Sequence, residues 1–256
     1  MHFVNRSQYK NAPITELAEL HKQQQPEWLR YKNWLATKQP PEAKKPGNFW
    51  TLKRIKNPLM QLFKNNCGYC GEYAGEKNSG EVDHFFPKEA DIGAEFIYAW
   101  DNYVWACHSC NNLKRNHYTL INPCCEEETN EILFISDGRY KVRDTADEKI
   151  QEKFALTETK TWINGNNYPR RRRNINQFME VALEDIKRCK DIYDTEKSID
   201  ENSEETRIAL TDLEKAKADF REYLAACDFI LLKMFLLEKY KKANPSFTYS
   251  YSELIP

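Results

Sequence analysis

The sequence predicts an α+β protein that is mostly helical and contains a small strand–strand–helix domain stapled by cysteines. Three observations predict this class: helical periodicity in the first sixty residues, two Cys-x-x-Cys pairs around two short strand patterns, and long helical patterns after residue 145. The expected organisation is an N-terminal helical region (1–64), the cysteine-containing domain (65–125), and a hairpin plus a helical C-terminal region that binds a partner or substrate (126–256).

The N-terminal region is expected to form three helices. Apolar residues at helical spacing predict the first over 15–22. Pro26 suits the first turn of a helix, so a second helix is expected to begin there. Its apolar face would hold Trp28, Tyr31, Trp34 and Leu35. The proline-containing stretch 38–47 predicts a loop, and 49–64 predicts a third helix with a break or kink near Pro58.

The middle and end of the chain follow a different pattern. Half of the eight glycines fall between 68 and 80, which predicts turns. Two short segments, 81–86 and 103–106, predict strands, and a helix is expected to open at Ser109 or Cys110. A Ser-Asp-Gly turn then predicts a hairpin over 131–142. Helical patterns follow over 147–156, 169–193 and 203–242.

The bulk composition excludes some classes of protein. A net charge of −1 and a pI near 6.6 argue against a protein that coats nucleic acid by overall charge. No apolar run approaches the roughly 20 residues that a membrane span needs. The first residues carry no apolar signal segment, so we expect a cytoplasmic, reducing location without membrane partners.

In a reducing compartment, paired Cys-x-x-Cys spacings indicate metal ligands rather than disulfides. The two pairs are Cys67/Cys70 and Cys107/Cys110, and 36 residues separate them. Four thiolates can complete the tetrahedron that a structural Zn²⁺ prefers. The sequence therefore predicts a structural zinc site with a folded insertion between its two halves.

The insertion contains an Asp-His pair with the chemistry of phosphodiester hydrolysis. Such hydrolysis needs an activated water and relief of charge on the phosphate and the leaving oxygen. A neutral His84 can take the proton of the water, and Asp83 offers the hard oxygen that Mg²⁺ prefers. Asn111, on the expected helix, can offer a second oxygen. His108 and His117 are not needed as zinc ligands, and His108 is a minor candidate for substrate contact.

Three runs of residues together resemble an HNH endonuclease of the zinc-knuckle kind, over about residues 67–123. They are Val82-Asp83-His84-Phe85-Phe86-Pro87-Lys88, Trp100-Asp101-Asn102, and Cys107-x-x-Cys110-Asn111-x-x-Lys114. The resemblance implies the ββα-metal fold, with His84 as general base and Asp83 and Asn111 as ligands of Mg²⁺ or Mn²⁺. It also implies that Asn102 braces the loop and orients the histidine. Lys114 would face the phosphate, and Lys88 is a second candidate for that contact.

The features after the helix are similar to the HNH subunits of bacterial Septu and related retron anti-phage systems. These features are Ile121-Asn122-Pro123, the hairpin, and Trp162-Ile163-Asn164 ahead of the arginines. This resemblance implies an ABC/SMC-like ATPase as a partner that controls the nuclease. Such a partner would supply the specificity that a nearly neutral chain lacks.

A basic run, Arg170-Arg171-Arg172-Arg173, opens the first long C-terminal helix. Four cations at a helix N-terminus oppose the macrodipole, which favours binding of phosphates or of an acidic partner face over a merely solvated helix start. DNA is the favoured substrate. The alternatives are an RNA substrate, such as tRNA, for the same site, or a zinc-knuckle interaction subunit without catalysis. The presence of Asp83, His84, Asn102 and Asn111 together argues against the last alternative.

Overall fold

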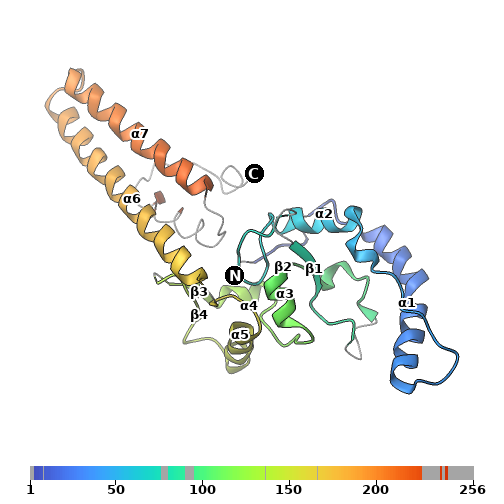
Figure 1. Cartoon of the computed structure of the whole chain (residues 1–256). Coiled ribbons are helices and arrows are strands. Elements are labelled where there is room, and N and C mark those ends of the chain that lie inside the picture. The colour runs from blue at the N-terminus through green and yellow to red at the C-terminus, as the bar shows by residue number, and fades with distance from the viewer. Residues whose placement is uncertain are drawn as a thin grey trace. The chain divides into compact units, whose positions relative to one another are not determined.

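The computed structural model describes residues 3–7, 9–75, 80–89, 95–135, 137–165, 167–226, 237, 240 and 241. The chain forms two compact units: residues 1–133 with 140–165, and residues 134–139 with 166–256. The mostly helical α+β class predicted from the sequence is confirmed (Figure 1). The predicted ranges 1–64, 65–125 and 126–256 remain a prediction about domain boundaries.

The first helix, α1, runs without interruption over Ile14–Thr37 and has Pro26 in its interior. The prediction of two helices with a start at Pro26 was therefore wrong. Proline removes one backbone hydrogen bond from a helix interior, which normally favours a break. Here Leu17 and Trp28, eleven residues or about three turns apart, are both buried, so packing on the two sides of the proline holds one continuous helix.

Two antiparallel strands form the centre of the first unit, as predicted. Strand β1 spans Gly80–His84 and strand β2 spans Tyr103–Cys107, and the register pairs Gly80 with Cys107 and His84 with Tyr103. Helix α3, His108–Lys114, begins directly after β2. A Cβ on Gly80 would lie 2.1 Å from the carbonyl oxygen of Ala74, so the strand can start this close to the cysteine turn only with glycine.

Helix α2, Lys53–Leu62, covers this strand pair and continues through Pro58 without the expected break. Ile55 and Leu59 are fully buried on its inner face. A 3-10 turn over Phe49–Thr51 precedes α2 and buries Trp50. Helix α2 and the 3-10 turn thus pack against the strand pair.

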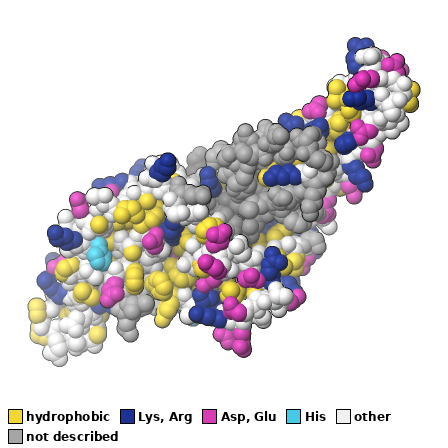
Figure 2. All heavy atoms as spheres, turned by 180° about the vertical axis from the view of Figure 1, so that it is seen from behind, with side chains coloured by type: hydrophobic (Ala, Val, Ile, Leu, Met, Phe, Trp, Pro, Cys, Tyr) yellow, Lys and Arg dark blue, Asp and Glu magenta, His cyan; other side chains and the backbone are white. Residues whose placement is uncertain are grey.

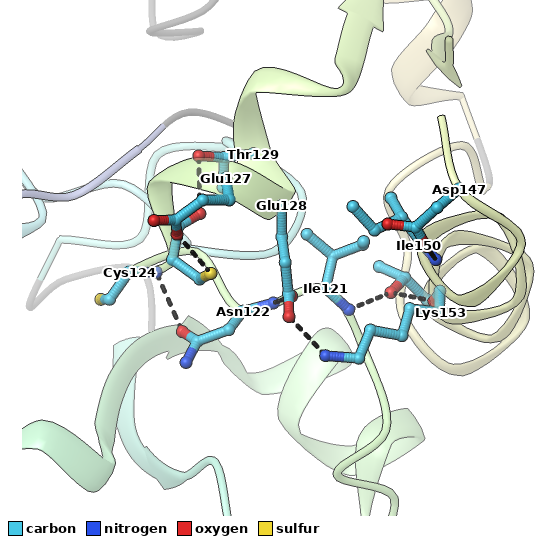
Figure 3. Close-up of polar contacts among 11 residues, drawn as sticks. Ile121, Asn122, Cys124, Glu127, Glu128, Thr129, Asp147, Ile150 and Lys153 are labelled. Carbon is cyan, nitrogen blue, oxygen red and sulfur yellow. Dashed lines mark hydrogen bonds and ion pairs between the residues drawn. The ribbon is translucent and has the colours of Figure 1, made fainter. Parts of the chain in front are cut away.

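The segment after α3 is fixed by side chains that bond to backbone groups (Figure 3). Thr157 accepts a hydrogen bond from the Ile121 amide at 2.8 Å, and Glu128 accepts one from the Asn122 amide at 2.8 Å. Glu128 also pairs with Lys153. The elements joined in this way are α4 (Glu126–Asn130) and α5 (Glu148–Lys160). This network attaches α5 to the cysteine-containing domain.

The predicted hairpin and long helices are present. Strands β3, Ile132–Phe134, and β4, Tyr140–Val142, form the hairpin. In the second unit, α6 (Tyr168–Ile199) and α7 (Glu204–Ala226) run side by side (Figure 1). Residues of these two helices and two later residues, Leu237 and Tyr240, form one core: Met179, Leu183, Ile186, Leu213, Phe220, Leu224, Leu237 and Tyr240. The last helix was predicted over 203–242, and most of its end lies outside the described residues.

Charged side chains of both signs cover the arm that α6 and α7 form (Figure 2). Their buried apolar residues recur at helical spacing on the faces that the two helices share, as in an antiparallel helical hairpin. None of the helices in the described part of the chain combines the length and apolar character that crossing a membrane requires.

Candidate functional site: a cysteine cluster beside an Asp-His cleft

The four predicted zinc ligands come together. The sulfur atoms of Cys67, Cys70, Cys107 and Cys110 all lie within 4.8 Å of one another, and all four residues are buried. The first pair lies in the turn after α2, and the second spans the end of β2 and the first turn of α3. Four clustered thiols without a disulfide are the donor set of a closed structural zinc site, so the residues fit this ion.

Burial disfavours the thiolate form of these cysteines when no cation is bound. It raises the pKa of the Cys70 and Cys110 thiols, because an isolated thiolate loses its hydration inside the protein. A divalent cation reverses that balance by binding the thiolates directly. The backbone N–H of Trp162 donates to the Cys110 sulfur at 3.3 Å, which is how outer groups stabilise thiolate ligands.

A cleft of about 950 Å³ is lined by residues of β1, of α3 and of the segments that follow them. Asp83, His84, Lys88 and Asn111 line it, as predicted for residues of one site. Further lining residues are Trp50, Lys56, Glu81, Glu89, Asn112 and Arg115. The cleft therefore combines carboxylate, imidazole and amide groups with several cations.

His84 is the last residue of β1 and is almost fully buried in the cleft wall. Its Nε2 lies 2.9 Å from the carbonyl oxygen of Ile97, so Nε2 carries the proton and Nδ1 is left as the acceptor. Trp50 and Tyr103 pack edge-on against the ring, at centroid distances of 4.6 and 5.1 Å. Burial lowers the pKa of His84 to about 3, which keeps the imidazole neutral.

Asp83 is held by two buried partners. The hydroxyl of Tyr69 donates to it at 2.5 Å, and the Lys114 ammonium lies 3.1 Å from the same carboxylate. Burial raises the pKa of Asp83, and Lys114 opposes that effect by favouring the charged form. Lys114 also donates to the His84 carbonyl at 2.8 Å, so one ammonium fixes both residues of the Asp-His pair.

Asn111 is held by an acidic residue of β1. Its side-chain nitrogen donates to Glu81 at 2.6 Å, which leaves the amide oxygen as the atom available to a cation. The other Glu81 oxygen lies 2.7 Å from Nδ1 of His108, and this carboxylate raises the pKa of the exposed His108. An amide oxygen and the Asp83 carboxylate facing one cleft suit Mg²⁺ or Mn²⁺, which take few protein ligands.

Asn102 bonds to backbone groups of the segment that follows His84. Its side chain accepts from the Phe86 amide at 2.7 Å and donates to the carbonyls of Phe86 and Phe96, at 3.1 and 3.0 Å. Phe96 is next to Ile97, the hydrogen-bond partner of His84. The asparagine therefore ties Phe86, two residues after His84, to Phe96, the neighbour of the His84 partner Ile97.

The cations predicted to bind phosphate differ in their exposure. Lys88 lines the cleft, whereas Lys114 is fully buried and pairs with Asp83, so its contact with a phosphate stays a prediction. Buried Asp83 requires a compensating charge, which accounts for this position. Arg172 is likewise fully buried and donates to the Gly138 carbonyl at 2.9 Å. Only Arg170, Arg171 and Arg173 of the run are exposed, and they lie in the second unit.

Sequence analysis missed three residues that shape this site: Trp50, Tyr69 and Glu81. Glu81 carried a usable signal, because residues two apart in a strand face the same side and Asp83 follows it by two. Tyr69 lies between two zinc-type cysteines, where the pattern gives no sign of a carboxylate partner. Trp50 reaches His84 only through the packing of the 3-10 turn.

Comparison with known proteins agrees with this geometry. Residues 67–117 match the family model described as HNH endonuclease. This segment is an HNH domain. The chain is also similar to the Septu protein PtuB of Bacillus mycoides (strain KBAB4), with 26% identity over 150 residues. That alignment covers 45% of this chain and 50% of the relative, so the chain spans about half the length of the protein it matches. No solved structure matches the chain.

Proposed function

We propose that this chain is a metal-dependent HNH endonuclease that hydrolyses phosphodiester bonds, with DNA as the favoured polymer. The observation that carries the proposal is the convergence of Asp83, His84 and Asn111 on one cleft within an HNH domain. The cysteine cluster, which fits structural Zn²⁺, brings together the turn after α2, the end of β2 and the first turn of α3.

In this proposal His84 takes a proton from the attacking water through Nδ1, because Nε2 is engaged by Ile97. Its pKa is low in the free protein, and the negative charge of a bound phosphate would raise it towards the working pH. Asp83 and Asn111 would hold Mg²⁺ or Mn²⁺, which supplies charge stabilisation at the phosphate and the leaving oxygen. Asn102 keeps the histidine oriented, and Lys88 attracts the phosphate.

The test is cleavage of plasmid DNA and of RNA by the full chain, with Mg²⁺ or with EDTA. His84→Ala is expected to lose at least about a hundredfold in rate and to keep its zinc content. His117→Ala is the matched control, since His117 is a histidine of the same domain that does not line the cleft. Full activity in His84→Ala would refute the assignment of the base. RNA cleavage without DNA cleavage would support the alternative substrate.

We further propose that the nuclease acts in cytoplasmic anti-phage defence and is controlled by an ABC/SMC-like ATPase. The similarity to a Septu protein supports this proposal. The exposed Arg170, Arg171 and Arg173 are offered as contacts to nucleic acid or to that partner. Zinc-loaded protein that cuts no polymer, alone or with the ATPase, would support the non-catalytic interaction subunit instead.

A further inference from the structure

Aromatic rings form a continuous series from the Asp-His cleft to the far half of α1. Trp50 contacts His84, and Trp28 lies 6.0 Å from Trp50 between ring centroids. Tyr31 follows at 6.0 Å from Trp28, and Trp34 stacks on Tyr31 at 6.0 Å with planes 28° apart. We refer to Trp50, Trp28, Tyr31 and Trp34 as the aromatic track.

Core packing accounts for one half of the track but not for the other. Trp50 and Trp28 are buried, and the indole of Trp28 donates to the Tyr98 hydroxyl at 3.1 Å, which anchors α1 beside the loop that orients His84. Tyr31 and Trp34 are only half-buried. They stack on each other, at the end of the helix that leads away from the strand pair (Figure 1).

Cations lie over the rings at both ends of the track. The Lys38 ammonium lies 4.3 Å from the Trp34 ring centre, and that of Lys88 lies 5.3 Å from the Trp50 ring centre. Residues 28–56, which contain all four rings, include eight Lys or Arg and one Glu, a net charge of +7 in a chain whose net charge is −1. Positive charge is thus concentrated in the part of the sequence that carries the four rings.

We propose that the aromatic track binds an unpaired nucleotide strand that continues from the scissile phosphate, with bases stacked on Tyr31 and Trp34. Sites for single-stranded nucleic acid combine stacking rings with a positively charged path for the backbone. The bases of a duplex are already stacked and paired, so they cannot use these rings. The inference rests on the proposed nuclease function, because it assigns the substrate strand to the same cleft. It makes a single-stranded or locally unpaired substrate the preferred one.

Binding without cleavage tests the track separately from catalysis. In the zinc-loaded full chain carrying His84→Ala, fluorescence anisotropy would measure affinity for labelled oligonucleotides of about 16 nucleotides, as single-stranded DNA, single-stranded RNA and duplex DNA. Adding Tyr31→Ala and Trp34→Ala together is expected to weaken single-strand binding at least about tenfold, and duplex binding less than about threefold. The DNA and RNA arms identify the natural polymer.

Two further variants distinguish stacking from structural damage. Leu35→Ala removes an exposed hydrophobic side chain of the same helix and is expected to leave binding unchanged. Trp34→Phe keeps an aromatic face and is expected to retain most of the affinity. Tighter binding of duplex than of single strands, or unchanged single-strand binding in the double alanine variant, would overturn the inference. If binding depends on Tyr31 and Trp34 but the unmutated chain cleaves no polymer, only the nuclease proposal is refuted.

Discussion

The cysteine cluster and the Asp-His cleft lie in the same domain and both use residues of α3, yet they differ in how much of a metal's surroundings the chain supplies. The cluster offers four buried sulfurs within 4.8 Å of one another, which leaves no position for water or substrate. The cleft offers Asp83 and Asn111 at the edge of an open space of about 950 Å³. A closed donor set stabilises a fold, whereas an open one leaves coordination positions for reacting groups.

The cysteine cluster and the cleft also differ in the polar groups that contact their side chains. The cluster consists of four buried thiols, and the Trp162 N–H donates to the Cys110 sulfur. The cleft carries a charged network in which Lys114 and Tyr69 hold Asp83, and Glu81 holds Asn111. Substitutions in the cysteine cluster should therefore change the stability of the fold. Substitutions in the cleft network should show which residues contribute to stability and which to the dependence of cleavage on Mg²⁺.

The largest effect is expected from Cys110→Ser. Loss of one thiolate weakens zinc binding, and zinc binding is coupled to folding, so the melting temperature should fall by more than about 10 °C. Metal analysis and thermal unfolding would measure this. Cys189→Ser, a half-buried cysteine of α6 outside the cluster, is the control. A zinc-free Cys110→Ser protein with normal melting temperature would contradict the structural role of the cluster.

Lys114→Met should cost about 3–5 kcal/mol of unfolding free energy, because it leaves the buried Asp83 carboxylate without its partner. Urea unfolding of the zinc-loaded protein would measure the loss. Adding Asp83→Asn should restore part of it by removing the uncompensated charge. Equal destabilisation in the single and double variants would show that the pair contributes through packing rather than charge.

Glu81→Ala should leave zinc and melting temperature nearly unchanged. It should raise the Mg²⁺ concentration needed for half-maximal cleavage about tenfold, because the Asn111 amide loses the group that orients it. Glu89→Ala is the matched control, since this acidic residue also lines the cleft and pairs with Lys88. The same Mg²⁺ shift in both variants would mean that only the overall charge of the cleft matters.

The smallest effect concerns pH. The pKa of His84 is lowered by burial to about 3, against an ordinary value of 6.5, so the unfolded chain binds a proton that the folded chain excludes. The stability from this group is complete above pH 6.5 and is lost progressively as the pH falls towards 3. As the pH falls from about 7.5 to about 5.5, the free energy of unfolding should decrease by about 1 kcal/mol. Urea unfolding of the wild type beside His84→Gln would measure it, and equal pH slopes would disprove the assignment.

The sequence by itself determined the cysteine pairs, the strand–strand–helix order and the position of the Asp-His pair. Each of these is a local pattern whose spacing carries its own geometry, so two strands and a helix could be assigned before any packing was known. The long helices of the second unit were predictable for the same reason, since apolar periodicity marks the face that α6 and α7 share.

Only the tertiary structure decided what each polar residue contacts. Lys114 turned inward to Asp83 and Arg172 to the Gly138 carbonyl, because burial and pairing depend on neighbours that are distant in sequence. α1 continued through Pro26 for the same reason, as packing on both sides outweighed the local preference for a break. The series of rings from His84 to Trp34 joins three separate segments, and no spacing along the chain encodes it.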